Sequence, residues 1–215
     1  MRLGGKAVAA CVLAACSLAH AADMPDVTMQ GVASGSSLKV GFEGHGARVL
    51  PQTVYLHDDR MRLEFQSAKQ QGYLLRDGKA VWLIDDKDKR AWPLQYSNSA
   101  RQFVFDVAGP CRTSAFSCER DGTKTIAGRA ATGWRFRHAG THGPDGSDNG
   151  TLWIDDQYGL LLGYHAEDMN SQSMDWTVTS VSFEPLPKEL FQLPDGTDPS
   201  GKPPRTGTDA QPEVR

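Results

Sequence analysis

Apolar and polar residues alternate along most of the chain with the period of two that is typical of β-strands. The alternation is clearest in TVYLHDDRMRLEF (53–65), where every second residue from Met61 to Phe65 is apolar and the residues between them are charged. This pattern indicates a strand with one buried face. The Asp58-Asp59 pair before it predicts a tight turn, so the whole segment is expected to form a hairpin.

Similar strand patterns recur at even spacing, with clusters of turn-forming residues between them. They cover residues 27–33, 37–44, 72–85, 90–94, 124–138, 150–168 and 174–186. Short strands at even spacing are typical of a mainly β fold in which consecutive strands pair as an antiparallel meander. The segment KELFQLP (188–194) is expected to add one helical turn.

The stretch from Gln95 to Glu119 interrupts this rhythm. It is compatible with a short helix that begins near Ser97 or Ser99, and equally with another strand at 103–107. It is also the place where a movable cover over the sheet is expected.

Two segments far apart in the chain share a motif of Trp, Ile and paired aspartates. They are AVWLIDDKDKRAWPL (80–94) and TLWIDDQYGLLLGYH (151–165). In a hairpin the Trp belongs to a strand, and the aspartates begin the turn, where Asp side chains bond their own backbone. A catalytic acid–base pair would instead need carboxylates held in a pocket with shifted pKa values. The paired aspartates, Asp85, Asp86, Asp155 and Asp156, are therefore expected to be exposed turn residues.

The N-terminus has the pattern of a secretory signal peptide. Arg2 and Lys6 precede an apolar run that is too short to span a bilayer, and Ala19-His20-Ala21 is a cleavage signal. The sequence thus predicts a signal peptide at 1–21 and a periplasmic or secreted protein. LAAC (13–16) also resembles the bacterial lipobox, and a lipid on Cys16 would instead anchor the chain to a membrane.

Charge and composition limit the remaining classes. Loss of two cations with the signal peptide moves the formal charge from −3 to −5, and no basic cluster remains, which argues against nucleic acid as a partner. No other stretch is long and apolar enough for a transmembrane span. Residues 197–215 are rich in Pro, Gly and Thr and are expected to be disordered. One domain, 22–196, is left.

Two cysteines remain after removal of the signal peptide, Cys111 and Cys118. A close, even pair in an oxidising compartment predicts a disulfide, and the loop that it closes corresponds to roughly 2.5 kcal/mol of chain entropy. A redox pair would usually have the C-x-x-C spacing, and a zinc site would need more ligands nearby.

Several segments resemble a known family. GRAATGWRFR, LWIDDQYGLLLGYH and WTVTSVSFEPLPKELFQLPDG are similar to the C-terminal half of secreted bacterial proteins related to the lipoprotein carriers LolA and LolB, and the resemblance extends over about 27–196. It implies a strongly curved antiparallel sheet, a half-barrel whose concave face forms an apolar cavity. In the carriers helices close that cavity, which holds acyl chains, but this chain lacks several clear helices. The family offers no shared catalytic residues to carry over.

The strand alternation and the resemblance together suggest which side chains would line such a cavity. They are Met61, Leu63, Phe65, Leu74, Trp82, Trp134, Phe136, Trp153 and Trp176. The partner would be a lipid, an acyl chain or a lipoprotein. If the same side chains instead fill the core, the chain is an envelope structural or protein-interaction module that binds another envelope protein. No catalytic motif such as G-x-S-x-G is present, and no cofactor is expected.

The loop HAGTHGPDGSDNG (138–150) offers the only spacing that suggests a metal. His138 and His142 are four residues apart, and Asp145 and Asp148 follow. Gly and Pro break any helix there, so the helical spacing of metal ligands does not apply. A solvated hairpin loop without metal is expected, although calcium bound by loop oxygens is conceivable.

Overall fold

The computed structural model describes residues 24–36, 49–66, 71–77, 80–94, 103–112 and 114–197. The expected signal peptide, the alternative Cys16 site, the strand expected at 37–44 and residues 198–215 of the expected tail lie outside these ranges.

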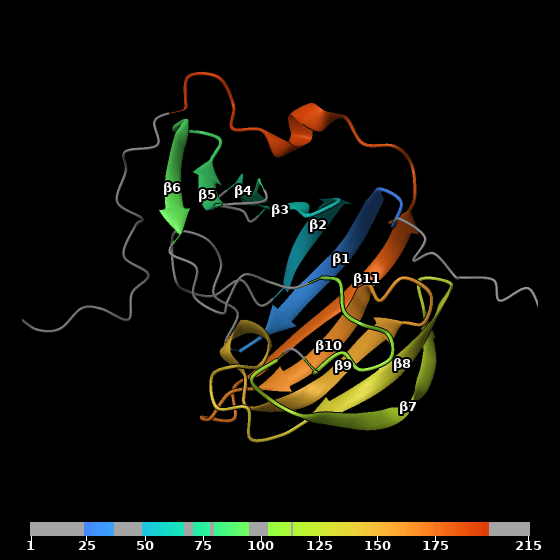
Figure 1. The fold of residues 1–215 in the computed structure, drawn as a ribbon. Coiled ribbons are helices and arrows are strands. Elements are labelled where there is room, and N and C mark those ends of the chain that lie inside the picture. Colours follow the sequence, from blue (N-terminus) through green and yellow to red (C-terminus); the bar gives the residue numbers. More distant parts are fainter. Residues whose placement is uncertain are drawn as a thin grey trace, which may run out of the picture.

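The described strands form one open antiparallel sheet that is strongly curved (Figure 1). The strands are β1 (Val27–Gly35), β2 (Val49–His57), β3 (Arg60–Gln66), β4 (Gln71–Arg76), β5 (Val81–Asp85), β6 (Arg90–Leu94), β7 (Cys118–Ile126), β8 (Arg129–Phe136), β9 (Asn149–Asp155), β10 (Leu161–Glu167) and β11 (Ser173–Ser182). Two short 3-10 helices complete the structure, η1 (Pro144–Gly146) and η2 (Lys188–Phe191). The predicted fold class, a mainly β protein built on a curved antiparallel sheet, is confirmed.

The strand order is β6-β5-β4-β3-β2-β1-β11-β10-β9-β8-β7. Consecutive strands pair within β1–β6 and within β7–β11, as predicted, and pairing of β1 with β11 joins these two meanders. β6 and β7 do not pair but form opposite edges of the sheet. The described part of the chain between them, residues 103–112 and 114–117, is called the crossing segment below.

One face of the sheet carries the main core and is called the inner face. Residues that pair across antiparallel strands point to the same side, so the register assigns Val54, Leu63, Leu152, Tyr164 and Trp176 to this face. All five are at most 6% exposed and belong to one continuous cluster. Both meanders therefore share a single core.

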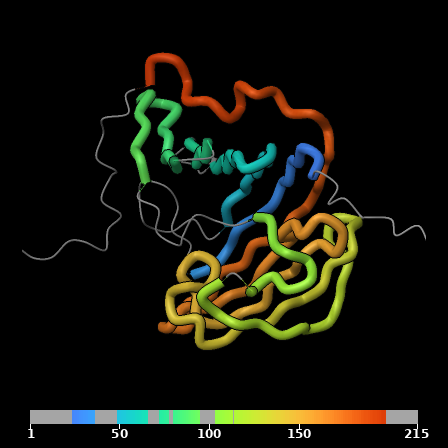
Figure 2. The backbone as a smooth tube through the Cα atoms, in the orientation of Figure 1, coloured from blue at the N-terminus to red at the C-terminus, as the bar shows by residue number. Residues whose placement is uncertain are grey.

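The opposite, outer face of β3–β6 has its own cover. After β11 the chain passes over these strands and places η2 there, with Phe191 buried against Tyr73, Leu75 and Ile84 (Figures 1 and 2). The helical turn expected at 188–194 is thus present, as the 3-10 helix η2.

Asp26 fastens this C-terminal segment to the start of β1. One carboxylate oxygen accepts the backbone N–H of Leu186 at 2.6 Å, and the other accepts Nδ1–H of His57 at 2.6 Å. His57 in turn stacks on Phe191, with ring centroids 5.7 Å apart. Burial alone would raise the pKa of Asp26, but these two hydrogen bonds and the charge of His57 outweigh it and hold the pKa below its usual value.

Candidate ligand site on the inner face

The crossing segment lies against the inner face, in front of β9 and β10 in Figure 1. Phe103 and Phe105 are both less than 10% exposed and belong to the main core. The N–H of Phe105 donates to the carbonyl of Gly159 at 2.8 Å, and the N–H of Leu161 donates to the carbonyl of Phe103 at 2.8 Å. The strand expected at 103–107 is thus present as an extended piece with an isolated bridge between Val104 and Leu160. The alternative, a helix that begins near Ser97 or Ser99, lies outside the described residues.

Gly159 makes this close approach possible. Its φ is +72°, and a Cβ at this position would lie 1.9 Å from the carbonyl oxygen of Phe105. A residue with a side chain would both strain the backbone and displace the crossing segment. Gly159, in the β9–β10 turn, thus leaves the space that the backbone of Phe105 occupies.

Aromatic side chains of the crossing segment fill the inner side of β8–β11. Phe103 meets Trp176 edge to face, with ring centroids 5.4 Å apart, and Phe116 meets Phe136 at 5.0 Å. Such pairs add to the free energy gained from apolar burial. Side chains of the protein itself therefore cover the part of the inner face where an apolar ligand would lie.

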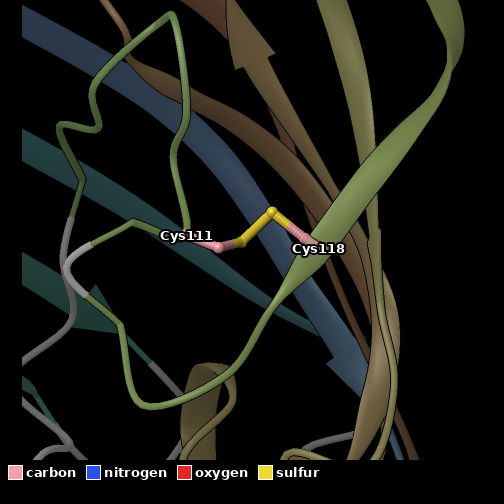
Figure 3. Close-up of a disulfide and its surroundings, with 2 residues drawn as sticks. All are labelled: Cys111 and Cys118. Carbon is pink, nitrogen blue, oxygen red and sulfur yellow. A yellow bond between two sulfur atoms is a disulfide. The ribbon is translucent and has the colours of Figure 1, made fainter.

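The Cys111–Cys118 disulfide anchors the end of the crossing segment (Figure 3). The Cα atoms lie 5.8 Å apart, and Cys118 is the first residue of β7. The predicted bridge is confirmed. It ties the turn around Cys111 to the edge of the sheet.

Seven of the nine proposed cavity residues share the inner face. They are Met61, Leu63, Phe65, Leu74, Trp134, Phe136 and Trp176. All except the half-buried Leu74 are between 1% and 9% exposed. A side chain that lines an open cavity remains accessible to water, so these residues are in close contact with protein atoms in this structure.

Trp82 and Trp153 lie on the outer face, so the expectation that all nine share one face is wrong for these two. In β5 it is Leu83 that pairs with Leu74, and Trp82 packs against the outer cluster instead. Both faces of β5 are covered, so its apolar residues point to both sides. Alternation of apolar and polar residues therefore cannot show which side chains of β5 face the inner side.

Trp153 pairs with Gly133 and Gly163, whereas its neighbours Leu152 and Ile154 enter the core. The ammonium of Lys124 lies 3.9 Å from the centre of the Trp153 ring. Burial beside this ring lowers the pKa of Lys124. The register thus places Trp153 on the outer face, where it contacts Lys124, although its partly buried ring also packs against members of the main core.

A pocket of about 170 Å³ opens on the side of β2–β4, among Thr53, Arg62, Glu64, Tyr73 and Asp86. Arg62 stacks on the ring of Tyr73 at 3.6 Å and donates to Glu64 at 2.8 Å. Burial raises the pKa of Tyr73. Pockets for drug-sized ligands measure roughly 300–1,000 Å³, so this polar recess is too small for an acyl chain.

The aspartates of the repeated motif do begin turns, as predicted. Asp85 accepts the N–H groups of Lys87 and Asp88, and Asp155 accepts those of Gln157 and Tyr158. The expectation that they are exposed holds for Asp156 alone, since Asp85 and Asp86 are half-buried and Asp155 is 2% exposed.

The reason is an ion pair that the sequence did not reveal. Nε of Arg129 donates to Asp155 at 2.7 Å, and the guanidinium also lies 4.8 Å from the ring centre of Phe183. A carboxylate with these partners is structural, since its acceptor sites face donors of the turn and of β8.

The carboxylate of Asp148 joins residues from both ends of the loop at 138–150. It accepts the N–H of Gly140 at 2.7 Å and the side-chain amide of Asn149 at 2.9 Å. His138 and His142 are exposed. Among the described residues no group of three or more His, Cys, Asp or Glu side chains is placed to hold a metal ion.

The comparisons with known proteins give a likeness of fold. No family model and no curated protein matches the chain. An uncharacterized conserved protein from Thermus thermophilus superposes with a TM-score of 0.51 at 14% identity, over 79% of this chain and 87% of that one. MucB gives 0.48 at 13% identity, over 80% and 58%, and a LolA superfamily protein from Nitrosomonas europaea gives 0.38 at 8%, over 79% and 90%.

LolA superfamily structures are thus among those that the chain resembles, as the sequence motifs predicted. The chain spans 58% of the length of the MucB chain. At these identities the likeness concerns the fold alone. In the described part of the chain, no helix has the length and apolar character needed to cross a membrane.

Proposed function

We propose that this chain is a non-catalytic extracytoplasmic protein that binds an apolar chain, such as the acyl chain of a lipid or lipoprotein, between the inner face of its sheet and the crossing segment. The disulfide supports an oxidising compartment, because such bonds persist in the periplasm and outside the cell. The signal peptide expected from the sequence agrees with that location.

The observation that carries the proposal is the way in which the crossing segment occupies the inner face. Phe103 and Phe105 contribute apolar surface where a ligand would lie, yet two backbone hydrogen bonds join residues 103–105 to the β9–β10 hairpin. An apolar ligand would replace this surface with its own at little net cost in burial.

Trp176 adds a polar group to the same place. Its indole Nε1–H is buried, and no hydrogen-bond acceptor for it lies among the described residues. Buried donors are normally paired, so a carbonyl or carboxylate oxygen of an acyl ligand would find an unused donor beside Phe103.

A second function is favoured by the close packing of the same residues. Because the inner-face candidates other than Leu74 are less than 10% exposed, the core is complete without a ligand. In that case the chain is an envelope protein-interaction module, and its partner binds elsewhere on the surface.

Native mass spectrometry of the protein purified from an oxidising compartment separates these two functions. A carrier is expected to retain fatty chains, or to bind an added fluorescent fatty acid in proportion to its concentration. A protein with a permanently filled core is expected to do neither, and that result would leave the interaction module as the function.

Two tryptophans provide an internal control for the site of binding. An acyl probe between the sheet and the crossing segment should quench the emission of Trp176 and leave that of Trp153, on the outer face, unchanged. Because Trp82, Trp92 and Trp134 also emit, the contribution of Trp176 or Trp153 is taken as the difference between the wild-type protein and the variant Trp176→Phe or Trp153→Phe. Loss of quenching in the Trp153→Phe protein would place the probe on the wrong face.

A further inference from the structure

We propose that residues 103–105 form a strap that detaches from the β9–β10 hairpin while the Cys111–Cys118 disulfide holds the following turn at the edge of the sheet. The inference rests on the proposed function for its purpose, since detachment of the strap is what would admit an apolar chain. It adds where the site opens and which part of the crossing segment stays fixed.

The strap pairs with the hairpin through an isolated bridge and not through a continuous strand. Its backbone is joined to the hairpin by the bonds from Phe105 to Gly159 and from Leu161 to Phe103, and Phe103 rests against Trp176. Burial of Phe103 and Phe105 in the main core opposes opening, but few backbone hydrogen bonds to the sheet have to break at once. Release of the strap breaks these contacts and leaves every pairing among the eleven strands intact.

The next residues form a unit of their own. Asp106 accepts the N–H of Ala108 and Gly109, and its carboxylate lies 3.5 Å from the guanidinium of Arg112. The N–H of Arg112 donates to the carbonyl of Gly109. This turn closes on itself, ends at the disulfide and does not need the strap to keep its shape.

Downstream of the disulfide-bonded Cys111, Phe116 packs on Phe136. Motion of the strap is thus confined to the side of Trp176, and the pivot lies in the turn that begins at Asp106. The half of the inner face near Phe136 stays covered.

Hydrogen exchange of the wild-type protein tests the motion without any ligand. The amides of Phe105 and Leu161 should exchange at least about tenfold faster than amides in the middle of β9–β11, because they open locally. Exchange of both only at the rate of the central strands would mean that the strap leaves the sheet solely on global unfolding, and the proposal would fail.

The strap offers a site for a matched cross-link. Val104 and Leu160 form an antiparallel bridge, and the bonds on either side of them make this a non-hydrogen-bonded pair. Cα atoms in such pairs are about 4.5 Å apart, within the range of a disulfide. The double variant Val104→Cys with Leu160→Cys should therefore lock the strap, and the two single variants carry the same side-chain changes without the lock.

In the locked protein, exchange at Phe105 should slow to the rate of the central strands, and binding of a fluorescent fatty acid should weaken at least tenfold relative to both single variants. Equal binding by locked and single variants would overturn the strap as the entrance. Absence of binding in every protein, together with fast exchange that the lock abolishes, would refute the proposed function and leave the motion established.

A variant without the disulfide tests whether this bond anchors the turn. In Cys111→Ser with Cys118→Ser the turn loses its anchor, so the exchange of the Arg112 amide should rise together with that of Phe105. An unchanged rate at Arg112 in the folded variant would show that the disulfide does not anchor the turn.

Discussion

The two copies of the motif of Trp, Ile and paired aspartates look alike in sequence but are expected to differ in stability, and this difference is measurable. Asp155 is buried and accepts three donors, Nε of Arg129 and the N–H groups of Gln157 and Tyr158. In the Asp155→Asn variant one oxygen becomes an NH₂ group, which faces at least one of these donors. A buried donor without a partner costs about 1–3 kcal/mol, and loss of a charge-assisted bond adds to this.

Breaking a buried ion pair by removal of one partner costs about 3–5 kcal/mol. Arg129 remains 16% exposed and can be hydrated in part, so the low end of this range applies. We expect Asp155→Asn to lower the free energy of unfolding by about 3 kcal/mol. For a domain of this size the midpoint of thermal unfolding should fall by roughly 6–12 °C.

Asp85→Asn is the matched control, because Asp85 caps the equivalent turn and is more exposed than Asp155. An amide oxygen can still accept one of these N–H groups, so the free energy of unfolding should change by less than about 1 kcal/mol, as is usual for surface sites. Both variants are to be compared by urea denaturation at pH 7 with the disulfide intact. Equal effects of the two substitutions, whether large or small, would refute the argument from burial.

Three further expectations concern the C-terminal segment and the strap. Because the pKa of Asp26 is lowered in the folded protein, its contribution to stability is complete above the unfolded pKa of about 4 and is lost as the pH falls through the lower folded value. Asp26→Asn should remove this contribution at pH 7. Denaturation at several pH values should then show a flatter dependence of stability on pH between about pH 5 and 2 than in the wild-type protein. Phe191→Ala should cost about 3–5 kcal/mol, as for other buried aromatic residues, and should increase protease cleavage near η2; an unchanged urea midpoint would mean that η2 does not stabilise the sheet. Gly159→Ala should displace the carbonyl of Phe105 and accelerate hydrogen exchange of the Phe105 amide. An exchange rate equal to that of the wild-type protein would mean that Gly159 is not needed for the packing of Phe105.

The local features of the fold followed from the sequence because they depend on neighbouring residues. The hairpin of β2 and β3 was readable from strict alternation and from the Asp58-Asp59 turn, in which Asp58 takes a φ of +53°. The disulfide followed from the spacing of two cysteines in an oxidising compartment. The paired aspartates were assigned to turns on the same local grounds.

Features that depend on distant parts of the chain could not be read in this way. The sequences of β1 and β11 do not indicate that these two strands pair. Backbone hydrogen bonds can form with the free edge of any strand, so they do not select the partner. Asp155 appeared exposed because its partner Arg129 is 26 residues away. Trp82 was assigned to the wrong face since the outer cover of β5 comes from Phe191, far along the chain.

One signal for that cover was nevertheless present. β4 and β5 contain consecutive apolar residues, such as Leu74-Leu75 and Leu83-Ile84, instead of alternation. A strand with apolar residues on both sides has both sides buried, so a second layer was implied over the outer face. The segment SFEPLPKELFQLP is the part of the chain with enough Leu and Phe to provide it.

The strap also places a condition on any ligand. Phe103 and Phe105 already bury apolar surface on the inner face, so a ligand gains only the difference between its own contacts and theirs. If the strap is open in a fraction of molecules, the observed affinity is the intrinsic affinity reduced by that fraction. A short apolar molecule cannot compensate for both aromatic side chains, whereas a long acyl chain adds favourable burial with each methylene, about 0.8 kcal/mol per group. Affinity should therefore rise steeply with chain length in a series of fatty acids, and Gly159→Ala, where the strap is already displaced, should bind every member of the series more tightly by a similar factor. Equal affinities of the two proteins across the series would show that the strap does not compete with the ligand.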